Sequence, residues 1–307
     1  MEPFRPLTRS QAHALDRIRR LGELHFCGVA SQLPVRPRLW PLLVGPTGAG
    51  KSFLARTAAA RLGAHYLPLS FGGWIAMGAR QVATAYTILH TALDCPRLVV
   101  HLDELDKLPV GRVGDWAQAV ANEVWALLDG QLPVERFAND PELRAVLHDE
   151  ERERLLREGV MHRLFLVGSG TWQSTYDESV APPPAVITGF GRQSDGGTKM
   201  DDACEIVVRA LESVRGPSSE LLARFDARML YIAPPTQDEA LMIVRRLGLL
   251  DSSSYAGAGE VASELARLLP RQGFRAIESV VTEALLRGWR PERTKGPANA
   301  APAGPGG

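Results

Sequence analysis

The chain has 307 residues, of which 45% are hydrophobic and 23% charged, which is typical of a globular protein with one large domain and a small one. The 35 basic and 35 acidic residues cancel, so no overall positive charge favours nucleic acid, although a local basic patch is still compatible with a neutral chain. We expect a cytoplasmic protein with reduced thiols and no membrane partner. Its cysteines (Cys27, Cys95 and Cys204) lack metal-ligand spacing, and no transmembrane-length apolar run or signal-peptide core is present.

Residues 1–38 are expected to form an N-terminal helix and a linker. The helix runs from Thr8 to Leu24 and is capped by Thr8 or Ser10, whose hydroxyls suit the N-cap position. This segment contains no zinc-binding cysteine cluster and no evident substrate-binding domain. The nucleotide-binding domain is expected to follow, over residues 39–234.

Residues 45–52 read GPTGAGKS and match the phosphate-binding loop pattern G-x-x-x-x-G-K-[ST] at every specified position. An apolar run, 39–44, precedes them as a predicted strand, and a helix-forming segment follows over 53–62. In this context backbone N–H groups wrap the phosphates, Lys51 places a cation on the transferred phosphate and the Ser52 hydroxyl binds Mg²⁺. The sequence therefore predicts ATP with Mg²⁺ as cofactors. The expected nucleotide-binding residues are Gly45, Pro46, Thr47, Gly48, Ala49, Gly50, Lys51, Ser52 and Phe53.

Two carboxylates end a later apolar run. Residues 66–70 are a short predicted strand and residues 79–93 a helix, and the run 97–102 then leads into Asp103 and Glu104. Because the carboxyl ends of parallel strands converge on the ligand crevice, Asp103 is expected to reach the Mg²⁺ shell. Glu104 is placed to orient and polarise the attacking water, which favours hydrolysis over transfer to a small acceptor. The alternative is a helix cap or a solvated turn.

Further strands and helices complete a doubly wound α/β domain with a five-stranded parallel sheet. A helix over 115–128 precedes a highly charged segment at 133–159, and residues 163–168 and 229–233 are the last two predicted strands. The stretch 175–200 is poor in apolar residues and is expected to be an insertion or mobile loop.

Only helices are expected after residue 234. Thr236 and Glu239 form a predicted capping box that opens the first of three short helices, and residues 235–290 are interpreted as a small helical lid domain. Residues 291–307 are rich in Pro, Gly and Ala and are expected to be a disordered tail.

From about residue 7 to residue 289 the chain resembles the AAA+ ATPases, and among them it looks most like the Clp-type protein unfoldases. The resemblance implies an ATP hydrolase that forms a ring, usually a hexamer, with ATP between neighbouring subunits. The matching segments are GPTGAGKS at 45–52, LVVHLDELDKL at 98–108, LFLVGSGTW at 164–172, SSELLARFDARMLYIAPPT at 218–236 and GFRAIES at 273–279.

The resemblance also implies roles for individual residues. Arg224 matches the arginine finger that reaches the γ-phosphate in the neighbouring subunit, although a solvated helix-end cation is the alternative. Arg275 matches the lid arginine that contacts nucleotide within its own subunit, with Arg271 or a surface role as alternatives. Thr171 or Ser169 fills the position that senses the γ-phosphate, where many members have asparagine.

Trp74 and Ile75 fall where the unfoldases carry an aromatic–aliphatic–glycine loop that grips polypeptide in the central pore. This chain has Ala76 where the family favours glycine. The two glycines before the pair predict an exposed loop, and the alternative is that both side chains belong to the core.

The predicted function is a homo-oligomeric ring that uses ATP hydrolysis to remodel, unfold or translocate a protein substrate. The alternative is a nucleic-acid-linked AAA+ ATPase, such as a helicase loader or a transposition or recombination regulator, for which only Arg80 and Arg112 are available as loop cations. A third class is a nucleotide switch in which hydrolysis times assembly. No tripeptide of the kind that docks a protease ring is evident, so a dedicated protease partner is not expected.

Overall fold

The computed structural model describes residues 8–34, 37–79, 84–108, 115–131, 158–172, 217–226, 229–249 and 258–287. The chain divides into two compact units, one spanning Leu7–Pro234 and the other comprising Pro235–Gly307 with Met1–Pro6. The expected insertion at 175–200 and tail at 291–307 lie outside the described residues, as does the charged segment 133–159 apart from its last two positions. Cys204, Arg80 and Arg112 lie outside them as well.

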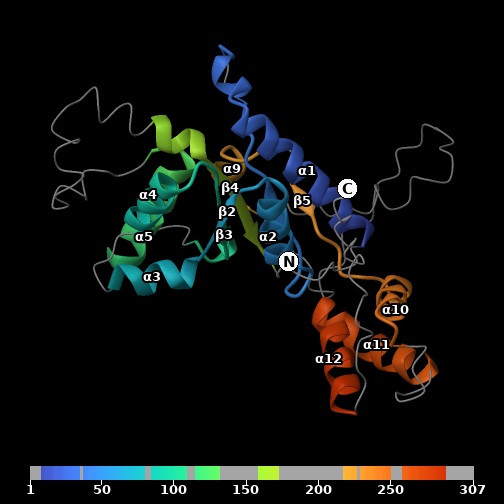
Figure 1. Ribbon diagram of the computed structural model, residues 1–307. Helices are drawn as coiled ribbons and strands as arrows, with labels where there is room; N and C mark the ends of the chain where they lie inside the picture. The colour runs from blue at the N-terminus through green and yellow to red at the C-terminus, as the bar shows by residue number, and fades with distance from the viewer. Residues whose placement is uncertain are drawn as a thin grey trace, which may run out of the picture. The chain divides into compact units, whose positions relative to one another are not determined.

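The larger unit is built on a five-stranded parallel sheet in the order β2-β3-β4-β1-β5, which confirms the predicted fold class. Figure 1 shows the strands side by side between helices. Non-consecutive neighbours place β1 in the interior of the sheet, so the loop that follows β1 opens at the edge where β3 and β4 also end. The strands are β1 Leu42–Val44, β2 His65–Ser70, β3 Leu98–Asp103, β4 Leu164–Gly170 and β5 Leu230–Tyr231.

Helices cover both faces of this sheet, with α1 and α2 on one face and α3, α4 and α5 on the other (Figure 1). Alternate residues of a strand point to opposite faces. In β3, Val100 accordingly packs on the side of α3 to α5 and Val99 on the side of α1 and α2. The helices and 3₁₀ turns of this unit are α1 Arg9–Phe26, η1 Val29–Gln32, α2 Lys51–Arg61, α3 Phe71–Ala79, α4 Thr84–Asp94, η2 Leu105–Lys107, α5 Asp115–Leu128 and α9 Ser219–Leu222.

The N-terminal helix α1 is capped by Thr8, whose Oγ1 accepts a hydrogen bond from the Gln11 backbone N at 3.3 Å. The sequence left this cap open between Thr8 and Ser10. One helical face of α1 is buried against the sheet and α2. Gln11 also donates from Nε2 to the Ala49 carbonyl at 2.8 Å, so α1 braces the loop between β1 and α2.

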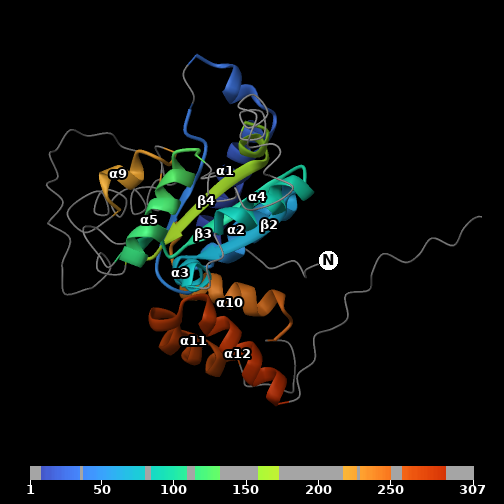
Figure 2. The same ribbon diagram turned by 90° about the vertical axis from the view of Figure 1, so that its left-hand side faces the viewer.

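The smaller unit is helical, with α10 Gln237–Arg246, α11 Ala258–Gln272 and α12 Phe274–Leu286 sharing one apolar core (Figure 2). The predicted capping box is confirmed: Thr236 Oγ1 accepts from the Glu239 N at 3.2 Å, and Glu239 Oε2 accepts from the Thr236 N at 3.0 Å. Among the described helices of both units, none is long and apolar enough to cross a membrane.

Candidate nucleotide site

The loop between β1 and α2 has backbone angles and close contacts that favour glycine over other residues. Gly48 and Gly50 have φ angles of 81° and 93°, in the left-handed region that L side chains rarely adopt. A Cβ on Gly45 would collide with the Ile232 backbone carbonyl oxygen on the adjacent chain segment after β5. The glycines of the pattern are therefore required by the fold of this loop, which leads directly into the N-terminus of α2.

Lys51 is the first residue of α2 and is only 7% exposed. Its Nζ donates to two carbonyls of the preceding loop, Gly45 O at 2.6 Å and Pro46 O at 3.1 Å. Burial lowers the pKa of Lys51, and the charges of Asp103 and Asp106 oppose this shift. The ammonium is thus held inside the loop by two backbone carbonyls.

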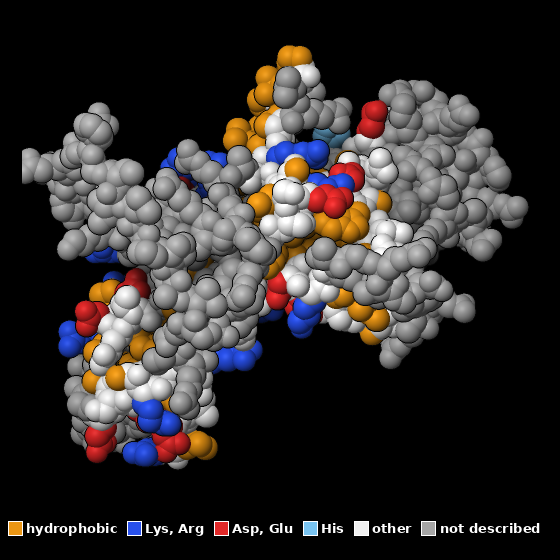
Figure 3. Space-filling view, turned by 180° about the vertical axis from the view of Figure 1, so that it is seen from behind, with side chains coloured by type: hydrophobic (Ala, Val, Ile, Leu, Met, Phe, Trp, Pro, Cys, Tyr) orange, Lys and Arg blue, Asp and Glu red, His pale blue; other side chains and the backbone are white. Residues whose placement is uncertain are grey.

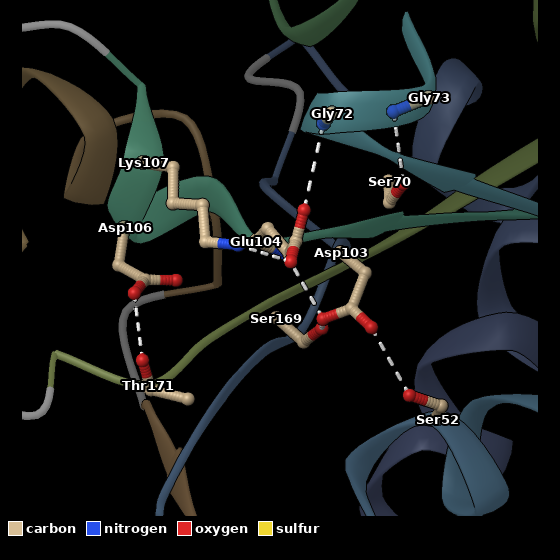
Figure 4. A network of polar contacts seen from close by, with 10 residues as sticks. All are labelled: Ser52, Ser70, Gly72, Gly73, Asp103, Glu104, Asp106, Lys107, Ser169 and Thr171. Carbon is tan, nitrogen blue, oxygen red and sulfur yellow. Dashed lines mark hydrogen bonds and ion pairs between the residues drawn. The ribbon is translucent and has the colours of Figure 1, made fainter. Parts of the chain in front are cut away.

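Asp103 ends β3 and lies between the loop and β4 (Figure 4). Its Oδ2 accepts from Ser52 Oγ at 3.1 Å, and its Oδ1 accepts from Ser169 Oγ at 2.6 Å and from the Glu104 N at 2.9 Å. Burial acts to raise the pKa of Asp103, but His101 and these hydrogen bonds outweigh it and hold the pKa below its ordinary value. The carboxylate is therefore ionised and oriented.

The oxygen donors at this position suit a magnesium ion. Mg²⁺ prefers hard oxygen ligands and usually binds through one or two carboxylates together with substrate phosphates and water. Ser52 and Asp103 supply such oxygens next to the loop. No group of three or more His, Cys, Asp or Glu side chains among the described residues could hold a metal by itself. A metal here would depend on phosphate oxygens for the rest of its shell.

Glu104 follows Asp103 with a φ of 64°, one of two positive φ values among the described non-glycine residues. Such a backbone costs on the order of 1–3 kcal/mol and persists only where the surroundings impose it, often at functional sites. The Glu104 carboxylate forms an ion pair with Lys107, and its Oε2 lies 3.4 Å from the Gly72 backbone N, just beyond β2. Figure 4 shows the side chain between these two groups.

Comparison with known proteins agrees with this geometry. Residues 41–167 match the family model described as "ATPase family associated with various cellular activities (AAA)", and this range contains the loop, Asp103 and Glu104. This part of the chain is similar to an AAA ATPase domain, which supports the resemblance to the AAA+ ATPases over these residues. The prediction of an enzyme that hydrolyses ATP is confirmed. A solved structure, the FIGL-1 AAA domain in complex with ADP, is 17% identical and covers 92% of this chain and 83% of its own, with a TM-score of 0.45, too weak a likeness to bear on function.

The fold brings Ser169 to the site and not Thr171. Ser169 is fully buried on β4 and donates to Asp103, whereas Thr171 Oγ1 donates to Asp106 Oδ2 in η2 at 2.6 Å (Figure 4). The sequence left the sensor position open between these two residues. Of the two, only Ser169 touches a side chain of the proposed metal site.

His101 and Tyr66 are polar neighbours of the site that the sequence reasoning missed. His101 lies in the middle of β3, is 1% exposed, and bonds Ser169 Oγ through Nε2 at 2.8 Å and the Tyr66 hydroxyl through Nδ1 at 2.9 Å. Burial lowers the pKa of His101 to about 4, so the ring is neutral at pH 7. The available signal was a histidine inside the otherwise apolar run of β3.

Arg224 follows α9 and is held within its own chain. Its Nε and Nη2 donate to the two carboxylate oxygens of Asp129 at 2.8 and 2.9 Å, and its guanidinium lies 4.9 Å from the centre of the Trp125 ring. The side chain is 18% exposed. Arg224 is therefore not the solvated cation considered as the alternative to a finger, but an oriented guanidinium at the end of α5.

Arg275 is an exposed residue in the first turn of α12, in the smaller unit. The side chain of Arg271, its alternative, is not among those described. The assignment of a lid arginine stays a prediction.

The predicted exposed loop at Trp74 and Ile75 is wrong. These residues lie in α3, where Trp74 is 2% exposed and donates from Nε1 to Glu123 Oε2 at 2.9 Å, while Ile75 packs partly buried against the same core. Phe71, Trp74 and Ile75 have the spacing of one helical face, which outweighs the two intervening glycines. The Gly73 backbone N donates to Ser70 Oγ, on the last residue of β2, at 3.1 Å.

Proposed function

We propose that this AAA+ ATPase hydrolyses Mg²⁺-bound ATP with Lys51 on the phosphates, Ser52 and Asp103 as metal ligands, and Glu104 orienting the attacking water. The observation that carries the proposal is the bond between Ser52 Oγ and Asp103 Oδ2, because it joins a hydroxyl of α2 to a carboxylate at the end of β3, the two oxygen donors that the proposal needs. When bound, Mg²⁺ would neutralise charge on the phosphate oxygens. The strained backbone at Glu104 supports a functional role for that residue.

In this proposal Glu104 must leave Lys107 in order to orient water, because the ion pair occupies the carboxylate that would accept the proton. The pair is partly exposed, with 33% of the Glu104 side chain accessible, so it costs little to exchange. The Gly72 backbone N lies near Oε2, the Glu104 oxygen that does not contact Lys107. It is a second group that the Glu104 side chain can bond after it leaves Lys107.

We further propose that the enzyme acts as a homo-oligomeric ring, a hexamer by its resemblance, with Arg224 completing the site of the neighbouring subunit. Among the described residues, Arg224 donates to the Asp129 carboxylate, directly after α5, and to the Glu220 backbone carbonyl in α9. None of these hydrogen bonds reaches the loop of its own subunit. A guanidinium that is oriented in advance loses less side-chain entropy when it meets phosphate. This arrangement favours action in trans.

For the work done by the ring, we propose remodelling of a protein substrate. The charge balance of the chain supports a protein over a nucleic acid. On the face drawn in Figure 3, the Lys and Arg side chains of the described residues lie among acidic and apolar ones. Since Trp74 and Ile75 are core residues, the substrate contact must come from other positions.

The test is the ATP turnover of the purified protein with an unfolded model protein such as casein, and separately with single- and double-stranded DNA at low and moderate salt. We expect stimulation by the polypeptide and none by DNA. Stimulation by DNA that declines steeply with salt would favour the nucleic-acid-linked class, since phosphate contacts release counterions. Turnover that responds to neither, with assembly that follows the bound nucleotide, would favour a switch.

A further inference from the structure

A buried chain of hydrogen bonds runs from Asp103 across three strands of the sheet. Asp103 Oδ1 bonds Ser169 Oγ on β4 at 2.6 Å, Ser169 bonds His101 Nε2 on β3 at 2.8 Å, and His101 Nδ1 bonds the Tyr66 hydroxyl on β2 at 2.9 Å. The Tyr66 and His101 rings are stacked, with centroids 6.1 Å apart. These residues lie on the face of the sheet that α1 and α2 cover.

The donor and acceptor of each hydrogen bond between Tyr66 and Asp103 follow from the protonation of these two residues. Asp103 is ionised and can only accept, so Ser169 donates its single proton to it. Ser169 must then accept from His101, which places the imidazole proton on Nε2 and leaves a lone pair on Nδ1. The Tyr66 hydroxyl, whose pKa burial raises to about 12, keeps its proton and donates it to Nδ1. The chain therefore donates in one direction, from Tyr66 to Asp103.

Packing alone gives no reason for a histidine in this strand. His101 is 1% exposed between apolar neighbours, and a buried polar ring is costly unless both nitrogens are bonded. Both are bonded here, and the far end of the chain is Tyr66, whose ring lies 5.6 Å from the Arg56 guanidinium on α2. The same helix begins with Lys51 and Ser52.

We propose that Tyr66 and His101 are positioning residues that orient Asp103, through Ser169, for the metal-bound nucleotide. With Oδ1 occupied by Ser169 and the Glu104 N, Oδ2 next to Ser52 is the oxygen that remains for the metal. Partners that hold a ligand in this way commonly change metal affinity when they are removed. The inference rests on the proposed role of Asp103 in holding Mg²⁺.

The test measures the affinity of the full chain for a fluorescent, non-hydrolysable ATP analogue with Mg²⁺ and with EDTA. Tyr66→Phe removes one hydroxyl and keeps the ring. We expect it to reduce the affinity gained from Mg²⁺ by about twofold to tenfold, the worth of one hydrogen bond, and to leave the affinity in EDTA unchanged. In a Ser169→Ala background the hydrogen bonds between His101 and Asp103 are already lost. There, Tyr66→Phe should change neither the affinity in Mg²⁺ nor the affinity in EDTA.

Two outcomes overturn the inference while the proposed site survives, as judged by Asp103→Asn abolishing the gain from Mg²⁺. One is an unchanged gain in Tyr66→Phe. The other is a loss of nucleotide affinity in Tyr66→Phe that is equally large in the Ser169→Ala background, or equally large in EDTA and in Mg²⁺. Either result would mean that Tyr66 acts through packing. If Mg²⁺ adds no affinity in the parent, or Asp103→Asn keeps the gain, both the site and the inference fail. A ¹⁵N spectrum of the His101 ring gives an independent check: protonation at Nδ1 in place of Nε2 would contradict the direction of the chain.

Discussion

Trp74→Ala offers the sharpest test of where α3 places its aromatic side chain. The indole is 2% exposed and its Nε1 donates to Glu123, which is itself 7% exposed. Truncating a buried tryptophan costs about 3–5 kcal/mol, and the Glu123 carboxylate also loses a donor. In a unit of this size, each kcal/mol corresponds to roughly 2–4 °C in Tm, so we expect a decrease of about 6–20 °C.

The assay is thermal unfolding followed by circular dichroism, with two comparison variants. Trp74→Phe keeps most of the packing and loses the hydrogen bond, so it should cost about 1–3 kcal/mol. Leu24→Ala changes a side chain that is 48% exposed on α1 and should stay within about 0.5 kcal/mol of the parent. An unchanged melt for Trp74→Ala, combined with a loss of substrate-stimulated turnover, would refute the core placement and restore the exposed loop.

Three further predictions concern the chemistry. Glu104→Gln should bind ATP like the parent but turn it over on the order of a hundredfold more slowly, because water activation is lost while phosphate contacts remain; parental turnover would contradict its role. Lys51→Ala should weaken nucleotide binding itself, by on the order of tenfold or more in a direct titration, and unaltered affinity would argue against its place on the phosphates. Asp129→Ala should lower turnover about tenfold without changing ATP affinity, because Arg224 loses its bidentate partner, whereas Glu220→Ala, which removes a more exposed and longer ion pair, should have little effect.

The parts of the site that the sequence predicted are those made by consecutive residues. The loop 45–52 and the pair Asp103–Glu104 are each defined by a strand end and the residues directly after it, so a local pattern is enough. The parallel sheet was likewise predictable from apolar runs separated by helical segments. In each case the physical cause acts over a few neighbouring residues.

The parts that the sequence did not predict depend on residues that only the fold brings together. Arg224 and Asp129 are 95 positions apart, and His101 and Ser169 are 68 apart on neighbouring strands whose register decides the contact. The error at Trp74 has a different origin. Two glycines were interpreted as a loop, although the apolar spacing around them is that of a helix whose indole finds Glu123 on α5.

The most direct test of the account mixes two inactive variants, Glu104→Gln and Arg224→Ala, and measures ATP turnover at increasing protein concentration. In a ring, an Arg224→Ala subunit has an intact Glu104 and can receive the arginine of a Glu104→Gln neighbour, so some interfaces regain a complete site. We predict that the mixture turns over ATP well above the sum of the separate variants, and that the gain grows with concentration. A mixture no more active than that sum, together with a parental rate per subunit that does not depend on concentration, would contradict the shared site.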